Sequence, residues 1–262
     1  MNQYKTSSEL KNIAREKLSG KYGSAMLVSP VIQCALAMAV SIPVVIMLMI
    51  PFALTAMVNN SDTNVLVGTL AVYLVMLPLA SLYGVLNTGV SLFYLNIACG
   101  RKHSVADLFY GFRTQFKKSL KLSAVVTLIS YVCMLPYQIF NCLHSINPRT
   151  EWVVCMVISY IACILVYVPI QLALSQCFYL LLDFPGYSVK ELLKLSVQVM
   201  KGHKKRLFYI QLSFIPVQFL CILSCYIGYL WVIPYMNMTN ALFFLDIMKP
   251  QVSTASYDSG TV

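Results

Sequence analysis

The sequence has 262 residues, of which 59% are hydrophobic and 11% are charged, and its mean hydropathy is +0.73. Soluble proteins carry about 25% charged residues, so this composition excludes an ordinary soluble domain and predicts an integral membrane protein. The formal net charge of +10 favours contact with anionic surfaces.

Five stretches lack Asp, Glu, Lys and Arg and exceed the roughly 20 residues that span a bilayer. They are residues 24–58, 65–99, 122–146, 152–182 and 207–245. The last stretch is too long for one span, so we expect two short helices that turn near Gly228. The sequence therefore predicts an all-α membrane protein with six transmembrane helices.

Basic residues gather before the first span, between spans two and three, and between spans four and five, whereas the opposite loops carry only Arg149. By the positive-inside rule, the amino terminus and both long loops are expected to be cytoplasmic. The basic residues that we expect to contact anionic phospholipid are Lys17, Lys21, Arg113, Lys117, Lys118, Lys204, Lys205 and Arg206.

A hydroxyl residue followed three positions later by an acid and then by leucine occurs three times. The pairs are Thr6 and Glu9, Ser104 and Asp107, and Ser188 and Glu191. This spacing is typical of a capping box at a helix start. Eleven residues after each acid come Gly20, Lys118 and Gly202.

We therefore expect one membrane domain over residues 1–262 that contains three repeats, each a surface helix followed by two spans. The repeats cover residues 6–99, 104–182 and 188–247, and a disordered tail covers residues 248–262. Because two spans return the chain to its starting side, the repeats would share one orientation.

The predicted surface helices at residues 7–18 and 104–121 are amphipathic, with apolar residues at helical spacing and basic residues around them. Such helices beside a span usually lie in the head-group plane. The alternative is that the apolar stripe of the first helix packs on the protein itself. Aromatic residues between basic ones also occur in nucleic-acid-binding proteins, but beside a span they favour lipid, so we expect no nucleic acid.

Three segments carry a resemblance to a known family. They are SSELKNIAREKLSGKYGSAMLV, GRKHSVADLFYGF, and the end from Asp183 through VMKGHKKRLFYIQLSFI to the segment with Trp231, Pro234 and Tyr235. Together they resemble the bacterial membrane-protein family catalogued as domain of unknown function nine-seven-five. The resemblance implies a six-span protein of the bacterial cytoplasmic membrane, and it supplies no catalytic residue.

Ionisable residues in the middle of a membrane span are functional candidates, but all nine acids lie in loops or at span ends. The spans instead hold amides near proline, and the candidate cavity-lining residues are Gln138, Gln171, Gln218 and Asn237. The alternative is structural, because such an amide can bond a carbonyl freed by the proline kink or a neighbouring helix.

We expect a non-catalytic protein, without metal or cofactor, that handles or transports a lipid or small amphipathic molecule, or that supports a membrane complex or export system. One alternative is an enzyme acting on lipid head groups through Asp107, Asp183 and His203 at the cytoplasmic face. Another is a scaffold or regulator, which requires no ligand pocket. An enzyme would need catalytic groups within about 3 Å of each other.

Overall fold

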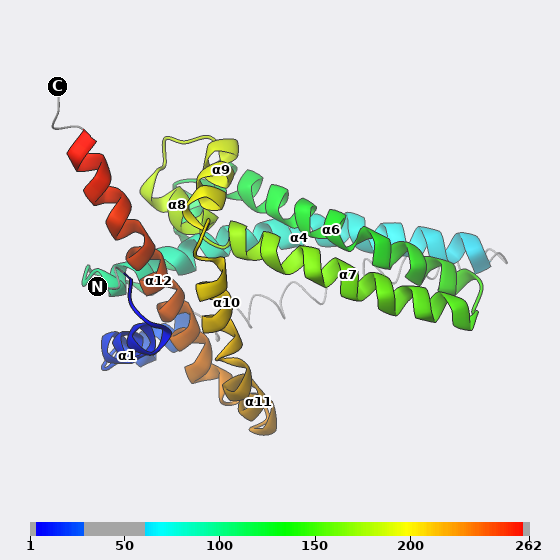
Figure 1. The fold of residues 1–262 in the computed structure, drawn as a ribbon, viewed down its shortest axis with the longest axis horizontal. Coiled ribbons are helices and arrows are strands. Elements are labelled where there is room, and N and C mark those ends of the chain that lie inside the picture. The colour runs from blue at the N-terminus through cyan, green and yellow to red at the C-terminus, as the bar shows by residue number, and fades with distance from the viewer. Residues whose placement is uncertain (1–3, 29–60, 259–262) are drawn as a thin grey trace. The chain divides into compact units, whose positions relative to one another are not determined.

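The computed structural model describes residues 4–28 and 61–258, with side chains described over 4–28 and 74–249. Every regular element in these residues is helical (Figure 1). The elements are α1 (Ser7–Leu18), α2 (Tyr22–Met26), α4 (Ser61–Ala98), η2 (Val105–Phe109), α5 (Tyr110–Arg113), α6 (Phe116–Ile146), α7 (Thr150–Leu174), α8 (Cys177–Asp183), α9 (Val189–Val199), α10 (Lys204–Leu212), α11 (Ile215–Leu223) and α12 (Tyr229–Asp258).

The chain divides into two compact units. Unit 1 comprises residues 1–34, 86–119 and 172–262, and unit 2 comprises residues 35–85 and 120–171. The unit boundaries fall inside α4, α6 and α7, so they do not coincide with the boundaries of the three predicted repeats.

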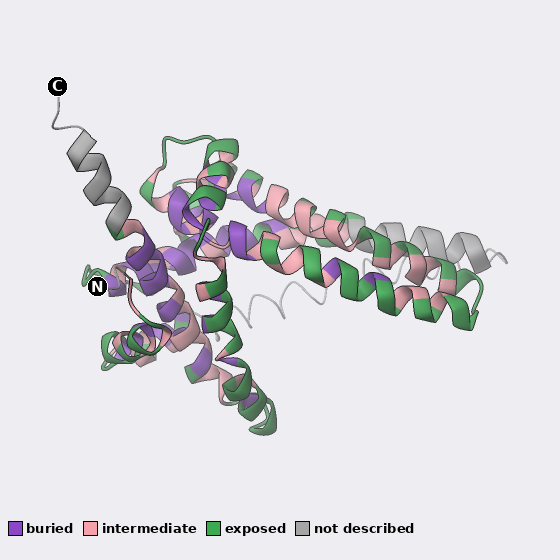
Figure 2. Ribbon diagram, viewed as in Figure 1, coloured by how far each residue is buried: buried purple, intermediate pink, exposed green. Residues whose placement is uncertain are grey.

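Unit 2 is a bundle formed by parts of α4, α6 and α7. Ser123 Oγ donates to the Ala80 carbonyl at 3.3 Å, and Gln171 Nε2 donates to Ser130 Oγ at 2.6 Å. Along α6 and α7, large apolar side chains are exposed, and Figure 2 shows these helices mostly as exposed or intermediate. They include Leu128, Val132, Ile139, Val157, Ile158, Ile161 and Leu165. Exposed apolar surface with internally bonded backbone is the pattern of lipid-facing helices.

Four helical segments among the described residues are long and apolar enough to cross a membrane. They are Leu74–Ala98, Phe116–Ile146, Thr150–Asp183 and Lys204–Leu223. The first predicted span falls almost entirely on residues 29–60, outside the described part of the chain. The structure therefore agrees with a helical membrane protein, while six spans and three repeats remain predictions.

The long apolar stretch at residues 207–245 breaks near Gly228, as predicted. Helix α11 ends at Leu223, α12 begins at Tyr229, and Cys225 and Tyr226 between them have φ of 52° and 67°. Helix α12 continues through Asp258, into residues 248–262, where a disordered tail is expected from the sequence. The apolar stretch ends at residue 245, before the helix does. A helix can continue past an apolar stretch because its backbone hydrogen bonds do not depend on apolar side chains.

All three predicted capping boxes are present. In each, the hydroxyl accepts from a backbone N–H of the first turn and the acid accepts from the backbone of the capping residue. Gly20 comes after α1 and Gly202 comes after α9. Their φ values are 75° and 89°, a conformation that favours glycine. These local signals were therefore sufficient to locate three helix starts.

The predicted continuous helix over residues 104–121 is wrong. After Ser104 the chain forms the 3₁₀ segment η2 and the short helix α5, and α6 begins only at Phe116. A Cβ placed on Gly89 of α4 would lie 1.9 Å from the Leu108 carbonyl oxygen, so the two backbones touch. This contact and the burial of Leu108 hold the segment against α4 in a tighter conformation than the apolar spacing predicts.

Unit 1 contains the larger core. Helix α1 packs against α12 and buries Leu10, Ala14 and Leu18 (Figures 1 and 2). Phe214 and Phe243 are also almost fully buried. The apolar stripe of the first helix thus packs on the protein itself, which is the alternative to the head-group arrangement.

Candidate functional site

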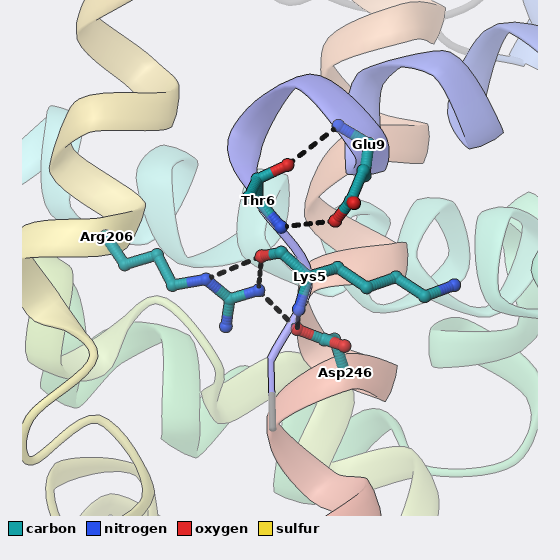
Figure 3. Close-up of polar contacts among 5 residues, drawn as sticks. All are labelled: Lys5, Thr6, Glu9, Arg206 and Asp246. Atoms are coloured by element: carbon teal, nitrogen blue, oxygen red, sulfur yellow. Dashed lines mark hydrogen bonds and ion pairs between the residues drawn. The ribbon is translucent and has the colours of Figure 1, made fainter. Parts of the chain in front are cut away.

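An ion pair connects α10, α12 and the segment before α1 (Figure 3). The Arg206 guanidinium contacts the Asp246 carboxylate through Nη2, and its Nε donates to the Lys5 carbonyl at 3.1 Å. The Lys5 backbone N–H donates to Asp246 Oδ2 at 3.2 Å. Three segments distant in sequence are thereby fixed beside the start of α1.

Aromatic rings surround the Arg206 guanidinium. Its central carbon lies 5.4 Å from the centre of the Tyr4 ring and 5.2 Å from that of Phe243. Guanidinium groups interact favourably with ring faces in this distance range. The negative charge of Asp246 is therefore already balanced by the positive charge of Arg206.

A cavity of about 270 Å³ lies between α1, the end of α4 and α12. We call it the lysine cavity. It is lined by Lys5, Leu10, Ile13, Lys17, Ala98, Leu242, Leu245, Asp246 and Lys249. Three lysines and five apolar residues in the lining give it the character of a site for an anion that carries an apolar portion.

Two other basic residues of α1 are engaged within the protein. Lys11 Nζ donates to Ser213 Oγ at 2.5 Å and lies 4.3 Å from the centre of the Phe214 ring. Burial lowers the pKa of Lys11 below its usual value. Arg15 lies over the Tyr235 ring at 5.7 Å. The basic face of α1 therefore divides between residues packed on the protein and Lys17 at the cavity.

The basic residues predicted to contact lipid have different surroundings. Lys17 lines the lysine cavity. Arg113, Lys117 and Lys205 are exposed, and Lys21 and Lys204 are half-buried. Lys118 donates to the Pro185 carbonyl, and Arg206 has Asp246 as an internal partner that the sequence pattern did not indicate.

A second cavity in unit 1, of about 200 Å³, holds one of the four predicted amides. We call it the amide cavity, and its lining comprises Asn87, Val90, Ser91, Ser175, Gln176, Phe178, Tyr179, Leu207, Gln211, Asn237 and Asn240. Asn237 is the one of the four predicted amides that belongs to this lining.

The three predicted glutamines have other environments. Gln171 bonds Ser130, and Gln218 Nε2 donates to Met236 Sδ at 3.3 Å. Gln138 is half-buried on α6. The contacts of Gln171 and Gln218 match the structural alternative, in which an amide bonds a neighbouring helix.

The three residues of the enzyme alternative, Asp107, Asp183 and His203, take part in helix capping, end a helix or pack against a ring. Asp107 accepts from the Ser104 backbone and from Asn96 Nδ2 at 3.1 and 3.2 Å. The His203 ring lies 4.6 Å from the Tyr4 ring, and burial lowers the pKa of His203. Asp183 ends α8. In residues 4–28 and 61–258, no group of three His, Cys, Asp or Glu side chains could hold a metal ion.

The sequence pattern missed most of both cavities. Asn87, Gln176 and Asn240 lie in apolar stretches and have no proline within three positions, so a pattern of amides close to proline does not indicate them. The partnership of Arg206 with Asp246 joins residues forty positions apart, and no spacing rule connects them.

The described residues form only helices, and four helical segments are long and apolar enough to cross a membrane, which is compatible with the class of helical membrane proteins. The chain belongs to the family described as Protein of unknown function (DUF975), whose model matches residues 1–251. No curated protein and no solved structure matches the chain.

Proposed function

We propose that this protein is a non-catalytic, multi-pass protein of a bacterial cytoplasmic membrane that binds an anionic lipid in the lysine cavity. The observation that carries the proposal is the combination in one cavity of Lys5, Lys17 and Lys249 with the apolar side chains of α1, α4 and α12.

The charge distribution supports an anionic ligand. Asp246 is the one acid of the lining, and its carboxylate already contacts Arg206 and the Lys5 backbone. The lining therefore contains three lysines and one acid, and that acid is already paired. Lysine binds phosphate as a compact charge through three rotatable donors, which suits a phospholipid head group.

The apolar lining supports an amphiphile rather than a free anion. Leu10, Ala98 and Leu242 are buried, and apolar atoms contribute about 0.8 kcal/mol for each CH₂ group that they remove from water. A phosphate bearing an acyl chain would use both halves of the cavity.

The proposed orientation places the amino terminus and the lysine cavity at the cytoplasmic face. The excess of basic residues before the first span and in the two long loops supports this orientation. Anionic lipids of the inner leaflet would then have direct access to Lys5 and Lys17, and each basic residue near such a surface contributes about 1 kcal/mol.

The experiment is native mass spectrometry of the full-length protein, purified from membranes that contain phosphatidylglycerol and phosphatidylethanolamine. We expect phosphatidylglycerol to remain bound to the wild type. A variant with Lys5→Gln, Lys17→Gln and Lys249→Gln should lose most of this signal, because the backbone N–H of Lys5 still bonds Asp246 while the three charges are gone.

The matched control is Lys190→Gln with Lys194→Gln and Lys201→Gln, which removes the same charge from exposed positions on and after α9. Equal lipid retention by the two triple variants would show that net charge alone governs binding and would overturn the lysine cavity as the site.

A further inference from the structure

The segment before α1 is held by contacts that meet at Arg206 and Asp246. The Lys5 backbone N–H donates to Asp246 Oδ2 at 3.2 Å, and the Lys5 carbonyl accepts from Arg206 Nε at 3.1 Å. Tyr4 and Lys5 are only half-buried, so these bonds are a large part of what holds them. A change that disturbs the pairing of Arg206 with Asp246 therefore disturbs the position of this segment.

His203 adjoins this cluster. It directly precedes α10, and the centre of its ring lies 4.6 Å from the centre of the Tyr4 ring, in an edge-to-face arrangement. The central carbon of the Arg206 guanidinium lies 5.4 Å from the centre of the same Tyr4 ring. Tyr4 is thus a neighbour of one side chain that is always charged and of one that titrates near neutral pH.

The charged and titratable groups that face His203 come from three elements. Arg206 and Lys204 belong to α10, Asp246 belongs to α12, and Tyr4 belongs to the segment before α1. The charge of Arg206 disfavours a charge on His203, and the charge of Asp246 favours one. Because Asp246 is already paired with Arg206, a second cation at His203 would compete for a carboxylate whose charge is balanced.

The surroundings of His203 set the direction of its pH response. Burial and the nearby Arg206 lower the pKa of His203 below its usual value of 6.5. The histidine therefore binds a proton more readily once the segment has moved away and the ring is hydrated. The attachment of the segment is most stable above about pH 6.5, and it weakens as the pH falls from there through the lower value of the folded protein.

We propose that protonation of His203 releases Tyr4 and Lys5 from α10 and α12. Lys5 lines the lysine cavity, so its release removes part of the wall of that cavity. The wall is complete at neutral pH and incomplete in acid. The release is a property of the protein alone, and only its effect on a bound lipid rests on the proposed function.

The experiment is amide hydrogen exchange of the full-length protein in detergent without added lipid, measured by mass spectrometry from about pH 7.5 to about pH 5.5. The reporter is the amino-terminal peptide that contains Lys5, whose N–H bonds Asp246. After correction for the intrinsic effect of pH on exchange, we expect its exchange to become severalfold faster at the lower pH. An unchanged corrected rate would overturn the proposal.

This pH range separates His203 from the capping box in the same peptide. The hydrogen bond from the Thr6 backbone N–H lowers the pKa of Glu9 below its usual value of 4.5. Glu9 therefore stays ionised over the whole range, and its bond from Thr6 does not change.

Two variants assign the response to His203. His203→Phe keeps a ring beside Tyr4 that cannot gain a charge, and His203→Gln keeps a polar side chain that does not titrate. In both, the corrected exchange of the reporter peptide should be the same at the two ends of the pH range. His103→Gln is the control and should respond as the wild type does, because it removes a histidine whose ring lies against Phe93 instead, at 5.5 Å between ring centres.

Thermal unfolding at neutral pH checks that each variant is folded. Where one His203 variant does not fold, the other decides the result. A pH response that persists in a folded His203 variant would overturn the proposal, because another group would then cause the release. Since no lipid is added, a failure of lipid binding leaves this result unchanged, and the two proposals can fail separately.

Discussion

Arg206 and Asp246 form an ion pair between α10 and α12, with side chains that are 20% and 6% exposed. The same Asp246 oxygen accepts from the Lys5 backbone, and the Lys5 carbonyl accepts from Arg206. The two charged residues therefore hold the extended segment before α1, and with it one wall of the lysine cavity, in place.

Asp246→Ala is expected to destabilise the protein. The substitution leaves the Arg206 guanidinium partly buried without its carboxylate, and Nη1 of Arg206 is already buried without a partner among the described residues. Removing one member of a buried pair costs about 3–5 kcal/mol. The measurement is thermal unfolding in detergent, where each kcal/mol corresponds to about 2–4 °C for a chain of this size.

The double variant Arg206→Met with Asp246→Leu is the matched comparison. It removes both charges, so it should be more stable than Asp246→Ala alone. A single variant that unfolds at the wild-type temperature would contradict the structural role of the pair.

Gly89→Ala is expected to displace η2 from α4. The added Cβ would lie 1.9 Å from the Leu108 oxygen and 2.4 Å from its carbonyl carbon, and backbone atoms cannot move aside as a flexible side chain can. Overpacking of this kind costs about 1–3 kcal/mol. Denaturant unfolding, followed by circular dichroism, measures the loss.

The control for this substitution is Gly186→Ala, where a Cβ meets nothing within 4 Å. Its stability should stay within about 0.5 kcal/mol of the wild type. Equal stabilities of the two alanine variants would contradict the close approach of α4 and η2.

The capping boxes predict a pH dependence. Hydrogen bonds from the Thr6 and Ser188 backbones lower the pKa of Glu9 and Glu191 below their usual value of 4.5. Because the pKa values are lower in the folded protein, the stabilisation is present above pH 4.5 and is lost as the pH falls through the folded values.

Glu191→Ala should therefore unfold at a lower temperature than the wild type at pH 7, and this difference should shrink as the pH falls below 4.5. Thermal scans from pH 7 to pH 3 measure it. Glu16→Ala, which changes an exposed acid outside the capping boxes, is the control. A difference that grows on acidification would exclude the proposed role of the carboxylate.

Signals that act within one helical turn were readable from the sequence. The three capping boxes and the helix break near Gly228 depend on residues a few positions apart, so their spacing carries the information. The helix over residues 104–121 was wrong because Gly89, on another helix, holds Leu108 close. Apolar periodicity records only which face is buried, and it does not record the partner.

The two cavities were less predictable for the same reason. Asn237 is indicated by its place near Pro234, whereas Gln176 has no proline within three positions, and its burial is visible only in the folded chain. The lysine cavity combines α1 and α12, at opposite ends of the chain, and the basic cluster at the amino terminus did not indicate which of its lysines would gather there.

The proposed topology makes a prediction for two exposed thiols. Cys99 follows α4 beside the basic cluster at residues 101–102, and Cys225 lies in the turn between α11 and α12. Between them the chain contains three candidate spans, in α6, in α7 to α8 and in α10 to α11. An odd number of crossings places the two cysteines on opposite sides of the membrane.

A membrane-impermeant maleimide should therefore label Cys99 in inside-out vesicles and Cys225 in right-side-out vesicles, with the modified peptides identified by mass spectrometry. The buried Cys163 and Cys177 serve as internal controls, because they should react only after unfolding. Labelling of Cys99 and Cys225 from the same side would exclude the proposed orientation and the access of inner-leaflet lipid to the lysine cavity.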